Sequence, residues 1–554
     1  MEGASESRLS HTAAFLFFLF FRAISASERN PAMSPYNPAE VILLSCGEHS
    51  QTEDGNGRIW KGDVEAGFLA SDKTITSTAD SQTSVPQVPY MTARIFTSKA
   101  TYVFPVSDGW KFVRLYFYPA NYNHFVASSA LFSVSSGRYT LLHNFSSYIT
   151  SQAQNLDYLI HEFSIYAKNG FLNLTFSPSP HVSNAYGFVN GIEIVSTLNI
   201  FSEPARAVLD GRMPPQTYRV LNESALQTVV RLNVGGRYIS PVEDSGLFRA
   251  WYDDSQYIYG AAFGVTFSSH LNKSIEYTAA VPPYMAPYEV YETARSMGPS
   301  PFINQNYNLT WIFPIDAGFN YMVRLHFCEI LPIIYKENQR VFKIFLHNQT
   351  AETEADVITW GDKKNGVAVY RDYFVLMSYD ASPELWVALY PNVATGTEYV
   401  DAILNGIEIF KLSAYDGNLA RSNPVLPSDI AVNTGPVYRS APPRNSKNGK
   451  LVAILVGVVA IASLVYVAFI TFSRWAYGSD AQRLPFTQFN QGRNKKEGQI
   501  ATSKRGRPFS FAEMKMAGDD HDGVDRHSTA HEDSEEHSQS QGAVFPYMME
   551  VRGR

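Results

Sequence analysis

Cysteine is scarce in this sequence, since only Cys46 and Cys328 occur among 554 residues. Two cysteines cannot staple a small scaffold, so a disulfide-rich fold is excluded. Charged residues make up only 18% of the chain and the formal net charge is −7, so no broad basic face favours nucleic acid as a partner. Long amphipathic helical windows are also scarce before residue 440, which argues against an all-helical protein.

Aromatic residues are abundant, because 33 Tyr and 36 Phe contribute to an aromatic content of 14%. Aromatic side chains pack well on a pleated surface, which favours strands. The runs VRLYFY from Val113 and VRLHFC from Val323 alternate in character, which predicts strands with one buried face. Many short strands with Pro and Gly turns predict an all-β fold of the sandwich or jelly-roll kind.

The region before residue 420 repeats itself. The duplication predicts two tandem domains over residues 40–197 and 226–411, joined by a connector over 198–225 with a cleft between the domains. Five short motifs recur in the same order: RIW and RAW at Arg58 and Arg249, TAR at Thr92 and Thr293, FPVSDG and FPIDAG at Phe104 and Phe313, VRLYF and VRLHF at Val113 and Val323, and NGIEI at Asn190 and Asn405.

A short apolar run lies near the N-terminus. Arg8 precedes the run AAFLFFLFF at residues 13–21, and the small residues Ser25 and Ala26 follow it. Nine apolar residues are too few to span a bilayer, which needs about 20. The pattern therefore predicts a secretory signal peptide over residues 1–25, with a buried N-terminal helix as the alternative.

Residues 451–472 form a second apolar run, without any charge. Its length predicts a transmembrane helix, with a buried core helix as the alternative. Eight basic residues follow it against three nearby ones before it, which predicts a single-pass type I protein of the plasma membrane with its N-terminus outside the cell. The proline-containing residues 413–450 predict an extended extracellular stalk, and residues 473–554 predict a short, mostly disordered cytosolic tail.

Glycosylation signals are consistent with this topology. All six Asn-x-Ser/Thr sequons precede residue 450, on the side predicted to be extracellular. In the strand predicted around Phe171, Asn173 alternates with leucines, which places the acceptor on the solvated face. The predicted glycosylation sites are Asn144, Asn173, Asn222, Asn272, Asn308 and Asn348.

Several motifs together resemble one protein family. They are LLSCG at Leu43, YMTAR at Tyr90, VRLHFCE at Val323, NGIEIFKL at Asn405, DGNLA at Asp416 and RPFSFAEMKMA at Arg507. They are similar to the paired malectin-like ectodomain, the membrane helix and the segment leading into the kinase of plant receptor-like kinases of the FERONIA type. The resemblance implies a cell-surface receptor that recognises extracellular carbohydrate, secreted peptides or both, with another membrane protein as co-receptor.

The sequence departs from that family after Ala517, where a tail of 37 residues rich in Asp, Glu, His and Ser follows. It contains no Gly-rich phosphate loop, Val-Ala-Ile-Lys, His-Arg-Asp or Asp-Phe-Gly motif, so no kinase activity is expected from these residues. The leading hypothesis is a binding protein without its own kinase. The alternatives are an incomplete gene model of an active receptor-like serine/threonine protein kinase and, as a third class, a glycoside-processing enzyme.

No catalytic constellation, cofactor motif or defined metal-ligand set stands out. The repeated Glu193 and Glu408 favour a structural role over acid catalysis, because both copies would need the same group. The matching Arg114 and Arg324 predict surface ion pairs or hydrogen bonds between sheets. The histidines of the acidic tail lack a defined ligand spacing, so no metal site is predicted.

Ligand binding is predicted for an aromatic run in the second copy. Carbohydrate recognition needs exposed aromatic faces flanked by polar groups. The run WYDDSQYIY supplies such groups, so Trp251, Tyr252, Tyr257 and Tyr259 are the candidate ligand-binding residues. The two cysteines do not occupy equivalent repeat positions, which favours two buried thiols over a disulfide between the domains.

Overall fold

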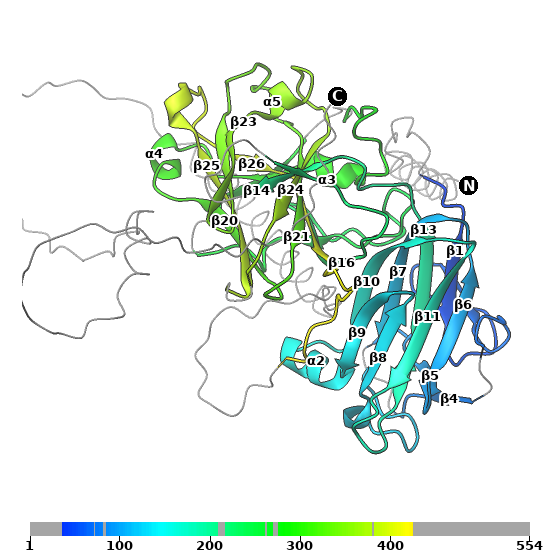
Figure 1. Ribbon diagram of the computed structural model, residues 1–554. Coiled ribbons are helices and arrows are strands. Elements are labelled where there is room, and N and C mark those ends of the chain that lie inside the picture. Colours follow the sequence, from blue (N-terminus) through cyan, green and yellow to red (C-terminus); the bar gives the residue numbers. More distant parts are fainter. Residues whose placement is uncertain are drawn as a thin grey trace, which may run out of the picture. The chain divides into compact units, whose positions relative to one another are not determined.

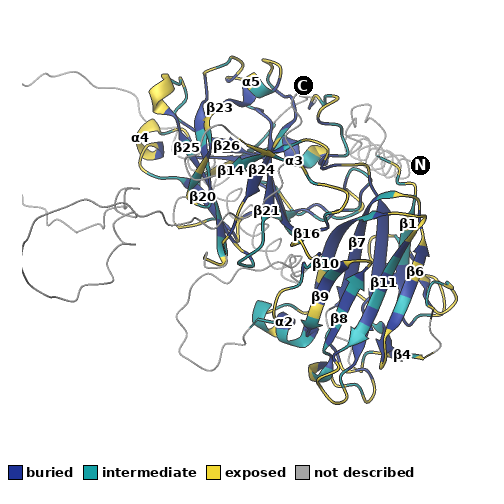
Figure 2. Cartoon of the chain, viewed as in Figure 1, coloured by how far each residue is buried: buried dark blue, intermediate teal, exposed yellow. Residues whose placement is uncertain are grey.

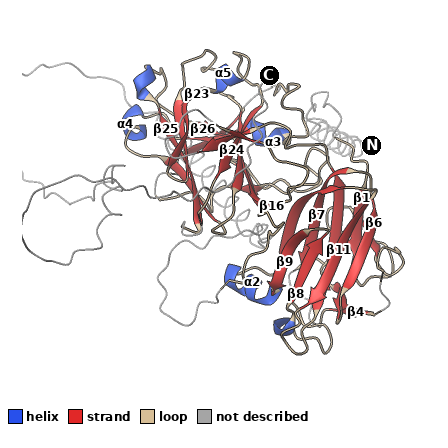
Figure 3. Cartoon of the chain, viewed as in Figure 1, coloured by secondary structure: helices blue, strands red, loops and turns tan. Residues whose placement is uncertain are grey.

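The computed structural model describes residues 36–70, 73–80, 85–208, 216–260, 263–269, 275–378 and 382–424. The predicted signal peptide, the predicted membrane helix at 451–472 and the predicted tail lie outside these residues. Within the described ranges, no helix is long and apolar enough to cross a membrane. Strands dominate and the helices are few and short, so the prediction of a mostly β fold is confirmed (Figure 3).

Residues 36–197, here called the N-terminal half, contribute strands to three sheets, the first of which continues beyond this half (Figure 1). The long strand β7 lies between β10 and β13, and β1 pairs with β13 and β3. The second sheet has the order β6-β11-β8-β9 and the third the order β12-β5-β4. The strands are β1 (Val41–Ser45), β2 (Thr52–Glu53), β3 (Ile59–Gly62), β4 (Thr74–Thr78), β5 (Thr92–Phe96), β6 (Ala100–Pro105), β7 (Gly109–Phe117), β8 (Phe132–Ser136), β9 (Tyr139–Phe145), β10 (Leu159–Ala167), β11 (Phe171–Pro178), β12 (Gly187–Val189) and β13 (Gly191–Ser196).

Residues 226–412, the C-terminal half, use the same strand order. Here β21 lies between β24 and β27, with sheets β20-β25-β22-β23 and β18-β19-β26 beside them. The strands are β16 (Leu226–Asn233), β17 (Tyr252–Asp253), β18 (Val265–Ser268), β19 (Thr293–Ser296), β20 (Leu309–Pro314), β21 (Tyr321–Phe327), β22 (Phe342–Leu346), β23 (Gln349–Ala355), β24 (Val369–Val375), β25 (Glu384–Pro391), β26 (Ile403–Leu404) and β27 (Gly406–Leu412).

Short helices close the loops of both halves. In α2 the Ser146 hydroxyl caps the first turn by accepting a hydrogen bond from the Ile149 amide, and Asn155 ends the helix in the left-handed region. Asp356 caps α5 in the same way. The helices are η1 (Ala127–Ser129), α2 (Ser147–Gln154), α3 (Tyr288–Glu292), α4 (Pro301–Asn304), α5 (Val357–Trp360) and η2 (Val393–Thr395).

The alternating strands are buried on both faces, which differs from the prediction. Every residue of β27 is buried. So is every residue of β21 and almost all of β7 (Figure 2). One face of each strand supplies a hydrophobic core, and the described chain has two such cores. The other face carries Arg, Glu, Tyr and His side chains that pair with one another, beside apolar residues such as Phe112 and Phe410. The alternation in the sequence shows which residues are polar, but it does not show which are exposed. These polar residues can be buried because they are paired with one another.

The two halves share a sheet. Strand β10 of the N-terminal half pairs antiparallel with β16 of the C-terminal half, through Phe163 opposite Gln227 and Ser164 opposite Leu226. The connector also contains the strands β14 (Ala205–Val208) and β15 (Thr217–Tyr218), and β14 pairs parallel with β24. The connector is therefore partly built into the sheet.

Residues 413–424, here called the return segment, lead back to the N-terminal half. The Leu419 side chain is fully buried in the core of that half. The Thr140 amide donates to the Gly417 carbonyl, and the Leu419 amide donates to the Thr140 carbonyl. Asn423 accepts a hydrogen bond from the Ser146 amide. This part of the predicted extended stalk is docked on the protein; the rest lies outside the described residues.

Candidate functional site

A buried ion network begins on the polar face of β7. The Arg114 guanidinium donates to Glu162 on β10 over 2.6 Å and to Glu193 on β13 over 2.7 Å. Its third nitrogen, Nη2, donates to the Leu247 carbonyl of the C-terminal half over 3.1 Å. The prediction of a surface ion pair for Arg114 is therefore wrong, because a guanidinium with three partners can be buried.

The RIW motif joins the same network. Glu193 also accepts hydrogen bonds from the Tyr116 hydroxyl and, over 3.2 Å, from Arg58 Nη1. Asp54 holds the motif from the other side, because it accepts from Arg58 Nε and from Trp60 Nε1, each over 2.9 Å. The repeated motif thus places an arginine and an indole around one carboxylate.

The C-terminal half builds the matching network on β21 and β27. Arg249 and Trp251 both donate to Asp244, over 2.9 and 3.3 Å. His326 Nε2 donates to Glu408 over 3.1 Å, in the place that Tyr116 takes in the N-terminal half.

Arg324 and Glu408 are also fully buried. Arg324 pairs with Asp372 over 2.7 Å and donates to the Ile200 carbonyl of the connector over 2.6 Å. Its prediction as a surface ion pair is wrong for the same reason as for Arg114. Glu408 is an acceptor for His326 and Arg231, which supports the predicted structural role of the repeated glutamates.

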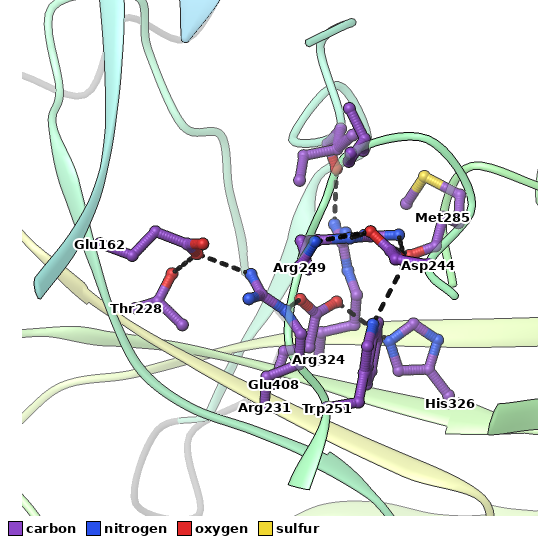
Figure 4. Close-up of polar contacts among 12 residues, drawn as sticks. Glu162, Thr228, Arg231, Asp244, Arg249, Trp251, Met285, Arg324, His326 and Glu408 are labelled. Atoms are coloured by element: carbon purple, nitrogen blue, oxygen red, sulfur yellow. Dashed lines mark hydrogen bonds and ion pairs between the residues drawn. The ribbon is translucent and has the colours of Figure 1, made fainter. Parts of the chain in front are cut away.

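Arg231 joins the networks of the two halves. It lies between Glu162 and Glu408, donating over 2.9 Å to the first and 2.7 Å to the second (Figure 4). Burial alone would raise the pKa of Glu162, but the charges of Arg231 and Arg114 outweigh it and lower that pKa to about 2. Glu162 is thus held ionised at the junction. Burial would also raise the pKa of Glu408, but the charge of Arg231 and the hydrogen bond from His326 lower it, so neither carboxyl is available as a proton donor near neutral pH.

A pocket of about 390 Å³ opens over this network, where the two halves meet. Its floor includes Arg58 and Arg114 from the N-terminal half and Arg231 from the C-terminal half. Its walls are mainly tyrosine and small apolar side chains. The wall tyrosines are Tyr90, Tyr116 and Tyr158 from the N-terminal half and Tyr238 and Tyr252 from the C-terminal half. The volume lies in the range of ligand pockets, which commonly form between domains.

The four aromatic residues predicted to bind ligand are not brought together. Trp251 is fully buried and Tyr257 is 5% exposed, with its ring 5.0 Å from that of Phe313. Tyr259 is 48% exposed. Only Tyr252 lines the junction pocket. The burial of Trp251 excludes one exposed platform made from all four, and ligand contact by Tyr252 stays a prediction.

Sequence reasoning missed Tyr158 and Tyr238 as pocket residues. No spacing in the chain links them, because they meet through the pairing of β10 with β16. Asp54 and Asp244 were also missed. They could have been found by extending the repeated motifs upstream, since acidic residues precede Arg58 and Arg249 by four and five positions.

No metal site is found within the described ranges, where no group of three His, Cys, Asp or Glu side chains could hold an ion. Cys46 and Cys328 are both buried thiols that are not joined in a disulfide, as the sequence favoured. Of the predicted glycosylation sites, Asn222 and Asn348 are exposed, and Asn144, Asn173 and Asn308 are half-buried. Asn272 lies outside the described residues. Glycosylation itself stays a prediction.

Comparison with known families decides the classification, because the malectin-like domain model matches residues 44–412. The chain belongs to the malectin-like family. It is 44% identical over 511 residues to the receptor-like protein kinase FERONIA of Arabidopsis thaliana, covering 87% of this chain and 56% of that protein. It is 40% identical over 393 residues to ANXUR1 of the same plant, covering 69% of this chain and 45% of that protein. The chain spans about half the length of the curated relatives it matches.

Solved structures give the same family. The crystal structure of the plant receptor-like kinase FER has a TM-score of 0.65 and 50% identity, over 70% of this chain and all of that one. The FER chain in a crystal structure with the plant peptide RALF23 and LLG2 is 51% identical, with a TM-score of 0.65, over 70% of this chain and 99% of its own length. The resemblance to the FERONIA type is thereby confirmed.

Proposed function

We propose that this chain is a cell-surface receptor-like protein whose two tandem malectin-like domains, residues 40–197 and 226–411, bind a secreted peptide together with a membrane co-receptor. The observation that carries the proposal is the likeness to the FER chain solved with RALF23 and LLG2. The shared strand order of the two halves supports the tandem arrangement. The buried, fully paired Glu193 and Glu408 favour binding over glycoside hydrolysis, because hydrolysis needs a carboxylic acid that can give up a proton.

The binding experiment uses the purified, secreted protein. RALF23 is titrated into it by calorimetry with and without LLG2, and the FER ectodomain is the positive control. A ternary complex that needs both added proteins is the expected result. The proposal fails if no complex forms under conditions in which the FER ectodomain assembles one.

The membrane arrangement is part of the proposal. The signal peptide at 1–25, the sequons and the apolar run at 451–472 support an extracellular N-terminal region anchored by one helix. External protease on intact cells that carry a C-terminal tag should leave the tag and remove an N-terminal epitope. Loss of the tag from intact cells would contradict the orientation.

A further inference from the structure

Four of the five tyrosines that wall the junction pocket, Tyr90, Tyr158, Tyr238 and Tyr252, keep their hydroxyls unpaired within the described residues. The rings of Tyr90 and Tyr158 lie 4.4 Å apart, and those of Tyr238 and Tyr252 lie 5.4 Å apart. Each pair comes from a different half. In the described part of the chain, no group hydrogen-bonds the hydroxyls of these four residues, whereas the Tyr116 hydroxyl is engaged by Glu193. The walls therefore combine aromatic faces with four unused hydroxyls.

The carboxylates on the floor of the pocket are largely engaged as acceptors, whereas, within the described ranges, two of its guanidinium nitrogens are not engaged as donors. Each oxygen of Asp54 accepts two hydrogen bonds, and Glu162 accepts three in total. Among the described residues, Arg58 Nη2 and Arg231 Nη1 have no hydrogen-bond partner, although the other nitrogens of both guanidinium groups do. A ligand in this pocket meets N–H donors and aromatic rings, and few free carboxylate acceptors.

We propose that the junction pocket binds an extended, proline-rich peptide segment, which rests on the proposed function as a peptide receptor and names the ligand class of this site. Proline offers a carbonyl acceptor but has no backbone N–H. It therefore brings no hydrogen-bond donor that would need an acceptor from the carboxylates, which are already hydrogen-bonded. Its ring packs against aromatic faces, and grooves between aromatic rings are the usual site for polyproline II segments. The extended form is largely preformed, so binding costs little ordering entropy.

A neutral sugar fits the same pocket less well. Every sugar hydroxyl brings a donor as well as an acceptor, and the carboxylates that would accept from it are already paired within the protein. Beside the paired carboxylates, the side-chain acceptors of the lining are few, mainly the tyrosine hydroxyls and the Asn56 amide oxygen, and they would have to serve these donors. A neutral oligosaccharide is therefore kept as the alternative outcome of the test.

The test is a set of three calorimetric titrations of the purified protein. The ligands are a capped hexaproline peptide, a capped Gly/Ser hexapeptide and cellohexaose. Of these three ligands, only hexaproline is expected to bind. Tyr158→Ala should weaken it about tenfold or more, because the half-buried ring is a wall of the pocket. Tyr252→Phe should weaken it by a smaller factor, since the ring stays and only the hydroxyl is lost.

Tyr335→Ala is the matched control, because Tyr335 is 54% exposed and does not line this pocket. Thermal unfolding of each variant identifies any that fail to fold. The proposal is overturned if hexaproline does not bind, if cellohexaose binds instead, or if the folded Tyr158→Ala variant binds hexaproline like the parent. RALF23 and LLG2 assembly on the same samples separates this failure from failure of the proposed function, because that complex can persist when hexaproline does not bind.

Discussion

Tyr116 in the N-terminal half and His326 in the C-terminal half take matching places. Each lies two residues after a buried arginine and hydrogen-bonds a buried glutamate, Glu193 or Glu408. The glutamate is the same in both halves and only its donor changes. What the position requires is a buried acceptor with a donor beside it, and two different side chains satisfy that requirement.

The surroundings of the two networks differ more than their members. Arg249 is fully buried and also donates to the Met285 and Tyr284 carbonyls, which close the C-terminal network. The matching Arg58 has a side chain 10% exposed and lines the junction pocket. One copy of the motif is thus part of a closed core, and the other forms the floor of a pocket. The comparison shows that a repeated motif can be part of a closed core in one half and line a pocket in the other.

The sharpest test of this comparison removes the two matching arginines in turn. Arg249→Met should lower the free energy of unfolding by about 3–5 kcal/mol, because it leaves the buried Asp244 without its ion partner. Arg58→Met should cost clearly less, since water can reach the carboxylates through the pocket. Urea unfolding of both purified variants measures the difference. Equal losses would show that the two networks are equally closed.

The return segment can be tested by a pair of truncations. Leu419→Ala should cost about 2–4 kcal/mol, because its buried side chain fills the core of the other half. Tyr415→Ala, at a residue 100% exposed, should change the stability by less than about 0.5 kcal/mol. Thermal and urea unfolding give both values. A small effect of Leu419→Ala would contradict the docking of this segment.

The C-terminal network has His326 where the N-terminal network has Tyr116. We therefore predict that only the C-terminal network makes the free energy of unfolding depend on pH between pH 5 and pH 7. Burial lowers the pKa of His326 below its ordinary value, and Arg324 opposes its charge, although Glu408 favours it. The unfolded histidine therefore binds its proton more readily than the folded one. Its contribution to stability is fully present above about pH 6.5 and is lost as the pH falls below that value.

His326→Gln should therefore reduce the loss of unfolding free energy between pH 7 and pH 5, whereas Tyr116→Phe should not. Urea unfolding at pH 5, 6 and 7 measures the slopes. Burial also lowers the pKa of His161, to about 3, so each slope is compared with that of the parent protein, in which His161 contributes equally. An unchanged slope for His326→Gln would mean that His326 is already protonated in the folded protein.

The smallest expected effect concerns the two thiols, one in each half. Cys46 and Cys328 are fully buried, and burial raises the pKa of Cys46. A thiol reagent should not react with the native protein. After the protein is unfolded in the absence of a reductant, the reagent should modify two thiols. Cys46→Ala should leave the reactivity of Cys328 unchanged. Unfolded protein that reacts only after reduction would reveal a disulfide.

Several structural features could be predicted from particular residues. The alternation from Val113 and from Val323 predicted β7 and β21, and the recurrence of NGIEI predicted matching strands at β13 and β27. These predictions hold because side-chain alternation is a local property of the extended backbone. The alternation could not distinguish a solvated face from a buried polar face. That depends on which loops cover the strand and which partners they supply.

The sequence by itself determined the strand-rich fold and the order of the repeated motifs, since both depend on periodicity and self-similarity along the chain. Only the tertiary structure decided that Trp251 is a core residue, that residues 413–424 dock on the N-terminal half, and that Tyr158 meets Tyr252 at one pocket. These facts depend on contacts between residues far apart in sequence. The physical reason is that burial and pairing are properties of the packed molecule, whereas polarity belongs to each residue alone.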